Sequence, residues 1–250
     1  MSRYFVEEAQ IANGRINIIG EDFQHLKKVL RAQIKDEVIV CCGGFDYTAE
    51  IEKINDSSII CVITDINKNF TESPLKVTLY QGLPKSDKME LIIQKCVELG
   101  VWEIVPVITE RCVSRINTDK DAKNKLARWQ KIAREASKQC NRGIIPNILY
   151  PVSFKEAVEM ASKAELAVIP YEKESAVGLK NIVSRYQGIT SGSIIIGPEG
   201  GFEEKEVQMA EDRGVKKISL GPRILRTETA GMVALSLLMY ELGDVSNGRT

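Results

Sequence analysis

Two apolar runs in the C-terminal third of the chain each end in Gly-Pro. The first, at 193–196, leads into GPEGG at 197–201, and the second, near 216–220, leads into GPRILR at 221–226. Glycine allows a ligand close to the main chain and proline stiffens a turn, so both loops offer backbone N–H and C=O groups. Ligands of open α/β sheets bind beyond the carboxyl ends of the strands. The pattern predicts a rigid pocket lined by backbone.

The segments around these loops predict an α/β fold. Beyond residue 75, strand-like runs alternate with amphipathic helices, which is typical of a mainly parallel sheet covered on both faces. Ser86 is predicted to cap the helix that ends at Gly100, and Ser153 with Glu156 forms a capping box.

The first 66 residues have a different pattern. Short alternating strands separated by turns predict a small β-barrel, interrupted by one helix at 22–33. The polar stretch 67–74 ends in proline and is predicted to be a linker between the two regions.

Composition narrows the class of protein. Lys+Arg and Asp+Glu number 34 each, so any contact with nucleic acid must use local basic patches. Six cysteines without a C-x-x-C motif and a single histidine disfavour a zinc site. The sequence has no apolar run near the ~20 residues that span a bilayer and no signal-peptide pattern at its start. We expect a cytoplasmic protein without a metal or a membrane association.

The familiar α/β ligand motifs are missing from the sequence. It contains no G-x-G-x-x-G after a strand, no P-loop, no H-E-x-x-H and no G-x-S-x-G. A backbone-lined pocket without a metal or an evident nucleophile favours a group-transfer cofactor that carries its own reactivity.

The pair GPEGGF and SLGPRILRTETA resembles the signature of the SPOUT class of S-adenosylmethionine-dependent RNA methyltransferases. More narrowly it resembles the RsmE-type enzymes, which methylate N3 of a uridine in 16S ribosomal RNA. The segments HLKKVLR at 25–31, 85–112 and 134–146 carry the same resemblance. It implies a PUA-like RNA-binding barrel at 1–70 and a SPOUT domain at 71–250. It also implies a deep trefoil knot at about 193–242, a homodimer and 16S ribosomal RNA as partner, within the small ribosomal subunit.

The resemblance assigns roles to the two Gly-Pro loops. S-adenosylmethionine is expected to contact Gly197, Pro198, Glu199, Gly200, Gly201, Leu220, Gly221, Ile224, Leu225 and Arg226. Arg226 is a candidate to stabilise the developing uracil oxyanion, unless it forms an ion pair in the knot. Glu228 is a candidate proton acceptor, unless it only interacts with a helix dipole. A side chain at Gly200 is expected to intrude on the cofactor.

Basic residues supply candidate RNA contacts: His25, Lys27, Lys28, Arg31 and Arg142. The spacing of Lys27, Arg31 and Lys35 predicts that they share one helix face, and Lys131, Arg134, Lys138 and Arg142 are predicted to share a face of the long helix. Either set could instead be an ordinary solvated face.

The last helix, ending near Leu242, is apolar almost all round, so it is predicted to be buried on more than one side. The resemblance favours a core helix that also forms the dimer contact, with Leu235 and Leu238 on the contacting face. Two other functions remain open: a SPOUT enzyme acting on another RNA position, and a non-catalytic RNA-binding assembly factor.

Overall fold

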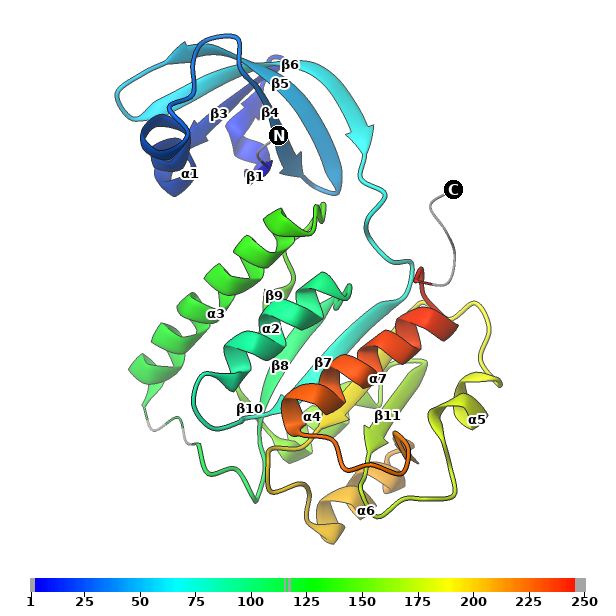
Figure 1. Ribbon diagram of the computed structural model, residues 1–250. Coiled ribbons are helices and arrows are strands. Elements are labelled where there is room, and N and C mark those ends of the chain that lie inside the picture. Colours follow the sequence, from blue (N-terminus) through cyan, green and yellow to red (C-terminus); the bar gives the residue numbers. More distant parts are fainter. Residues whose placement is uncertain (1–2, 115, 117, 246–250) are drawn as a thin grey trace. The chain divides into compact units, whose positions relative to one another are not determined.

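The computed structural model describes residues 3–114, 116 and 118–245 (Figure 1). Its contacts divide the chain into two compact units. The first unit comprises 1–72 and 137–145, and the second comprises 73–136 and 146–250. The segment 137–145, which the sequence places in the second domain, therefore packs with the first unit.

The first unit is built on a six-stranded sheet. Its strands are β1 Arg3–Phe5, β2 Ile11–Ala12, β3 Arg15–Ile19, β4 Glu37–Cys42, β5 Phe45–Ile54 and β6 Ser58–Lys68. They pair in the order β1-β4-β5-β6-β3-β2, and every pair is antiparallel except β1 with β4. Gly43 and Gly44 join β4 to β5 with φ of 58° and 80°, as a two-residue hairpin turn requires.

The helix predicted at 22–33 is shorter than the sequence indicates. It consists of α1, Gly20–Gln24, followed by one π-helical turn, η2, His25–Val29. Arg31 and Lys35 have φ of 52° and 76°, a left-handed conformation that no α-helix contains. The prediction that Lys27, Arg31 and Lys35 share a helix face is therefore wrong.

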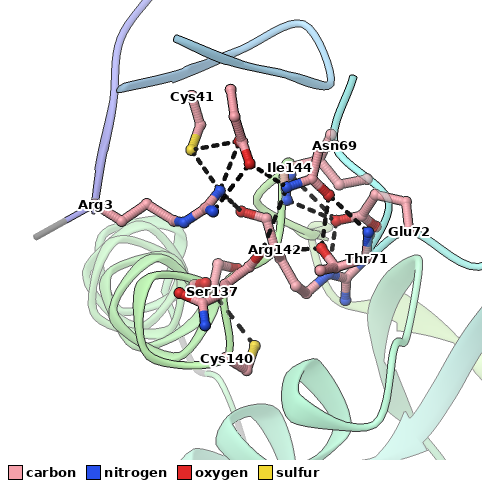
Figure 2. Close-up of polar contacts among 12 residues, drawn as sticks. Arg3, Cys41, Asn69, Thr71, Glu72, Ser137, Cys140, Arg142 and Ile144 are labelled. Atoms are coloured by element: carbon pink, nitrogen blue, oxygen red, sulfur yellow. Dashed lines mark hydrogen bonds and ion pairs between the residues drawn. The ribbon is translucent and has the colours of Figure 1, made fainter. Parts of the chain in front are cut away.

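The polar stretch 67–74 is largely part of the first unit, contrary to the linker prediction. β6 continues to Lys68, and Asn69 is buried. Asn69 donates to Asp46 at 2.9 Å, and the Thr71 hydroxyl donates to the carbonyl of Asn141 at 2.9 Å (Figure 2). The polar side chains of Asn69 and Thr71 thus form hydrogen bonds within the first unit, and their polarity does not indicate a solvent-exposed linker.

The second unit contains a parallel seven-stranded sheet, as predicted. Its strands are β7 Lys76–Gly82, β8 Glu103–Ile108, β9 Asn147–Ile148, β10 Val152–Ser153, β11 Leu166–Pro170, β12 Ser191–Ile196 and β13 Lys216–Ile218. The order is β10-β8-β7-β12-β11-β13, with β9 also paired to β8. All these pairs are parallel, so the carboxyl-terminal ends of the strands lie at the same end of the sheet.

Helices cover both faces of this sheet. They are α2 Lys88–Glu98, α3 Asp119–Gln139, α4 Phe154–Ala161, α5 Leu179–Val183, α6 Glu204–Asp212 and α7 Thr227–Glu241 (Figure 1). Ile195 packs in one cluster with Phe154 of α4, whereas the next residue of β12, Ile196, faces Gly231 of α7. The alternation along β12 thus directs neighbouring side chains to different helical layers.

Two of the three signals predicted at helix ends are confirmed. The capping box of Ser153 and Glu156 is confirmed, and Gly100 follows α2 with φ of 88°. Ser86 is not the cap of α2, because Asp87 occupies that position and Ser86 has a left-handed φ of 56°.

The last helix, α7, is a core helix. Leu235 and Leu238 are both 0% exposed within a single chain, so the prediction that they form a contact between chains is wrong. Leu237 and Tyr240 of the same helix are 38% and 56% exposed.

Among the described residues no helix is both long enough and apolar enough to span a bilayer.

Candidate active site

The Gly-Pro loops line one cavity of about 610 Å³ in the second unit. They follow β12 and β13, and a third wall, 170–172, comes from the end of β11. All ten residues predicted to contact the cofactor line this cavity: Gly197, Pro198, Glu199, Gly200, Gly201, Leu220, Gly221, Ile224, Leu225 and Arg226. The parallel sheet brings these loops together because successive carboxyl ends share one edge.

The GPEGG loop is a tight turn held from two sides. The N–H of Gly201 donates to the carbonyl of Pro198 at 2.9 Å, and Gly201 has φ of 68°. The end of β7 packs against the other side of the loop. A Cβ atom on Gly82 would lie 2.7 Å from the ring of Pro198, so only glycine lets β7 end this close to the loop.

Arg111 holds the outer side of the same loop. Its Nη1 donates to the carbonyl of Gly200 at 2.8 Å, and its Nε donates to Glu203 at 2.8 Å. A Cβ atom on Gly200 would meet the Cβ of Arg111 at 3.0 Å. A substitution of Gly200 would therefore strain the Arg111 contact first and would not probe the cavity directly.

The second loop presents its side chains to solvent. Gly221 has φ of 105°, Ile224 is 86% exposed and Arg226 is also exposed. In the part of the chain that the structure describes, the Arg226 guanidinium has neither a hydrogen bond nor an ion pair. The alternative of an ion pair is thus not supported, and Arg226 is available to an anionic group in the cavity.

Glu228 lies beside the cavity, in the first turn of α7, and does not line it. The Nζ of Lys88, which does line the cavity, lies 3.5 Å from Glu228 Oε2 and 2.9 Å from Glu199 Oε1. The backbone N–H of Lys85 also donates to Glu199, at 3.1 Å. Burial opposes ionisation of Glu199, but the hydrogen bond from Lys88, backbone hydrogen bonds and the charge of Lys88 together outweigh it and lower the pKa of Glu199.

Sequence reasoning missed Lys88 and Arg111. Lys88 and Glu199 are 111 positions apart, and Arg111 and Glu203 are 92 apart. No local periodicity links such distant positions.

Four of the predicted RNA contacts, His25, Lys27, Lys28 and Arg31, fall in or just after the α1–η2 region of the first unit. The exposed His25 ring shares a 3.2 Å hydrogen bond with the Tyr4 hydroxyl. Lys27 reaches the carbonyl of Asn55 at 3.1 Å, while Lys28 and Arg31 are exposed.

Arg142 does not fit its prediction as an RNA contact. The helix α3 ends at Gln139, and Asn141 has a left-handed φ of 62°, so Arg142 is not on the helix face. Arg142 is 3% exposed, and its Nη2 lies 2.6 Å from Glu72 Oε2 (Figure 2). A buried, paired guanidinium is not accessible to phosphate. The prediction of Arg142 as an RNA contact is therefore wrong, and Arg142 forms a structural ion pair with Glu72.

Comparison with known proteins matches both units to family models. Residues 71–239 match the RNA methyltransferase domain, and residues 18–64 match the RNA methyltransferase PUA domain. Ribosomal RNA small subunit methyltransferase E of Bacillus subtilis is 36% identical over 249 residues, covering 96% of this chain and 97% of that protein.

Two solved structures carry a cofactor. Ribosomal RNA small subunit methyltransferase E from Neisseria gonorrhoeae, bound to S-adenosyl methionine, is 32% identical with a TM-score of 0.87, covering 98% of this chain and 99% of that one. A methyltransferase from Legionella pneumophila in complex with the same cofactor is 34% identical with a TM-score of 0.86, covering 97% and 98%. The chain belongs to the RNA methyltransferase family that includes these ribosomal RNA small subunit methyltransferase E proteins.

Proposed function

We propose that this protein transfers a methyl group from S-adenosylmethionine to N3 of a uridine in 16S ribosomal RNA. The observation that carries the proposal is the cavity formed by GPEGG and GPRILR, in a chain that matches cofactor-bound relatives along nearly its full length. Its volume of about 610 Å³ lies within the roughly 300–1,000 Å³ of small-molecule sites.

The residues of the cavity fit this cofactor. Leu220, Ile224 and Leu225 offer apolar surface together with backbone N–H and C=O groups, which suits an adenine ring. Bound there, S-adenosylmethionine supplies an activated methyl group on a sulfonium, so the chain need not supply a nucleophile or a metal.

The chain's own contribution is to hold and orient the reactants. The two Gly-Pro loops would hold the cofactor against the uridine, and positioning of two reactants can lower a barrier by roughly 7–11 kcal/mol. The exposed guanidinium of Arg226 would stabilise negative charge that develops on a uracil carbonyl oxygen. The carboxylate of Glu228 would accept the N3 proton.

We propose that the RNA is held in part by the first unit, where Lys28 and Arg31 are exposed near His25 and Lys27. The family match over 18–64 to a PUA domain supports this assignment. Phosphate contacts of this kind contribute affinity that falls with salt. The domain limits 1–70 and 71–250, closure of the first sheet into a barrel, and a trefoil knot at about 193–242 belong to the same proposal.

We also propose a homodimer that uses the outer face of α7. Leu237 and Tyr240 of this helix, with Leu91 of the neighbouring α2, expose large apolar side chains. Exposed apolar groups of this size on adjacent helices are typical of an interaction surface. This surface replaces the buried Leu235 and Leu238 as the candidate contact.

The test is methyl transfer by the purified protein to small subunits and to free 16S RNA from cells that lack it, followed by mass spectrometry of the nucleosides. The expected result is 3-methyluridine with the wild type and a strongly reduced yield with Arg226→Met. Arg185→Met, a change at an exposed residue that does not line the cavity, is the control. Methylation of another atom would instead indicate a different RNA methyltransferase. Binding of RNA without any transfer would indicate an assembly factor.

A further inference from the structure

A single ammonium group connects the GPEGG loop to the start of α7. Lys88 Nζ lies 2.9 Å from Glu199 in the loop and 3.5 Å from Glu228 in the helix. The side chains of Lys88, Glu199 and Glu228 are 32%, 27% and 15% exposed. Partial burial strengthens such electrostatic contacts relative to those in open solvent.

The two carboxylates differ in how they are held. Glu199 accepts hydrogen bonds from Lys88 Nζ and from the backbone N–H of Lys85, so its position is fixed. Glu228 Oε2 is covered from solvent and, among the described residues, makes no hydrogen bond. Lys88 is its ion-pair partner, at a distance longer than that to Glu199. Among the described residues, Oε2 of Glu228 is therefore buried and held by the ion pair with Lys88, while the side chain as a whole is 15% exposed.

Lys88 itself is suited to orient a base and not to act as one. The hydrogen bond to Glu199 raises the pKa of Lys88 above its ordinary value, so the amine stays protonated. An ammonium has three donors and no acceptor, and it cannot take a proton from uracil.

We propose that Lys88 is a positioning residue that holds Glu228 as proton acceptor and links its orientation to the GPEGG loop. The proposal rests on the proposed function. In the step concerned, the N3 electron pair forms the bond to the methyl carbon, and the carbon–sulfur pair stays on sulfur. The N3–H bond breaks with its proton passing to the Glu228 carboxylate.

The test measures single-turnover methyl transfer at saturating cofactor and RNA, with cofactor affinity measured separately by calorimetry. We expect Lys88→Met to lower the rate by about 100-fold, the lower end of general acid–base contributions, with cofactor affinity changed less than about threefold. Lys88→Arg, which keeps the charge, should restore most of the rate. Lys95→Met removes another lysine of α2, paired with Glu98 outside the cavity, and should behave as wild type.

A double variant separates positioning from a merely structural role. If Lys88 acts through Glu228, then Lys88→Met should add little to the loss already caused by Glu228→Gln, because the effects share one group. Losses that multiply, or a Lys88→Met rate equal to wild type, would overturn the inference while the active wild type leaves the proposed function standing. A wild type that transfers no methyl group would refute the proposed function itself.

Discussion

The hydroxyl of Thr227 donates a hydrogen bond to the carbonyl of Gly197 at 2.5 Å, joining the first residue of α7 to the first residue of the GPEGG loop. The same hydroxyl accepts from Gln81 Nε2 at 2.9 Å. Gln81 is fully buried near the end of β7. One side chain thus connects the end of β7, the loop after β12 and the start of α7 around the cavity.

Replacing Thr227 with Val should therefore lower stability and weaken cofactor binding. The change keeps the shape but removes the donor to the half-buried carbonyl of Gly197 and one of the two acceptors of the buried Gln81 amide, which costs about 1–3 kcal/mol of stability. Urea denaturation should show this loss, and calorimetry should show weaker S-adenosylmethionine binding. Thr227→Ser keeps the hydroxyl and should stay close to wild type. Equal behaviour of the two variants would mean that the hydroxyl contributes nothing.

Gly82→Ala should displace the GPEGG loop. Its Cβ would lie 2.7 Å from the nitrogen and the ring of Pro198, a distance that requires the loop to move. We expect weaker cofactor binding in a variant that still folds. Gly192→Ala is the matched control within β12, because its Cβ would meet its nearest neighbour at an ordinary 3.5 Å. If both variants bind the cofactor as tightly as wild type, the contact beneath the loop is not needed.

Arg142→Met should destabilise the first unit. The Arg142 and Glu72 side chains are 4% and 20% exposed, and Glu72 also accepts from the N–H of Gly143 (Figure 2). Leaving one buried partner unpaired costs about 3–5 kcal/mol. Hydrogen exchange of the β4 and β5 amides measures the effect. Arg15→Met breaks an exposed pair with Glu52 in the same unit and should change stability little, because solvent screens such a pair. Equal losses of stability in Arg142→Met and Arg15→Met would show that the burial of the Arg142–Glu72 pair does not matter.

The first unit should lose stability in acid through Asp46. Burial opposes ionisation of Asp46, but hydrogen bonds from Arg3, Asn69 and Cys41 outweigh it and lower its pKa. Because the folded-state pKa lies below the unfolded value of about 3.9, the stabilisation is present above that pH and is lost as pH falls through the folded pKa.

The measurement is denaturation of wild type and Asp46→Asn, followed by circular dichroism from pH 7 down to pH 3. Asp46→Asn should be less stable at pH 7, and the difference should shrink as pH falls below about 3.9, because the carboxylate of the unfolded wild type then binds a proton before that of the folded state. Asp56→Asn alters an exposed turn residue and should follow wild type throughout. A difference that stays constant with pH would show that ionisation of Asp46 is not the cause.

Leu237→Asp should convert a dimer to monomers without unfolding the chain. Leu237 is 38% exposed in the single chain, so a carboxylate is tolerated there in the monomer but not in an apolar contact. Light scattering at micromolar concentration gives the mass. Met209→Asp, at a residue of α6 that is 40% exposed, is the control and should remain dimeric. A wild type that is itself monomeric would remove the dimer from the proposal.

The sequence by itself determined the elements whose causes are local. Periodicity predicted the buried face of α2, where Met89, Ile92, Ile93, Cys96 and Val97 are all buried. The alternation of strands and helices predicted the parallel sheet, and the two Gly-Pro loops predicted where the cavity lies. Such signals are readable because side-chain spacing and turn chemistry act within a few residues.

Tertiary structure alone decided which distant groups meet and where the two helices with basic residues end. The spacing of basic residues predicted that Arg31 and Arg142 lie on helix faces. In the structure Arg31 and Asn141 have left-handed φ angles beyond the ends of the helices, and Arg142 donates a hydrogen bond to Glu72. Lys88 could not be linked to Glu199 from the sequence, because 111 positions separate them and only the strand order brings them together. Local patterns report burial and turns, whereas pairing between charges depends on the path of the whole chain.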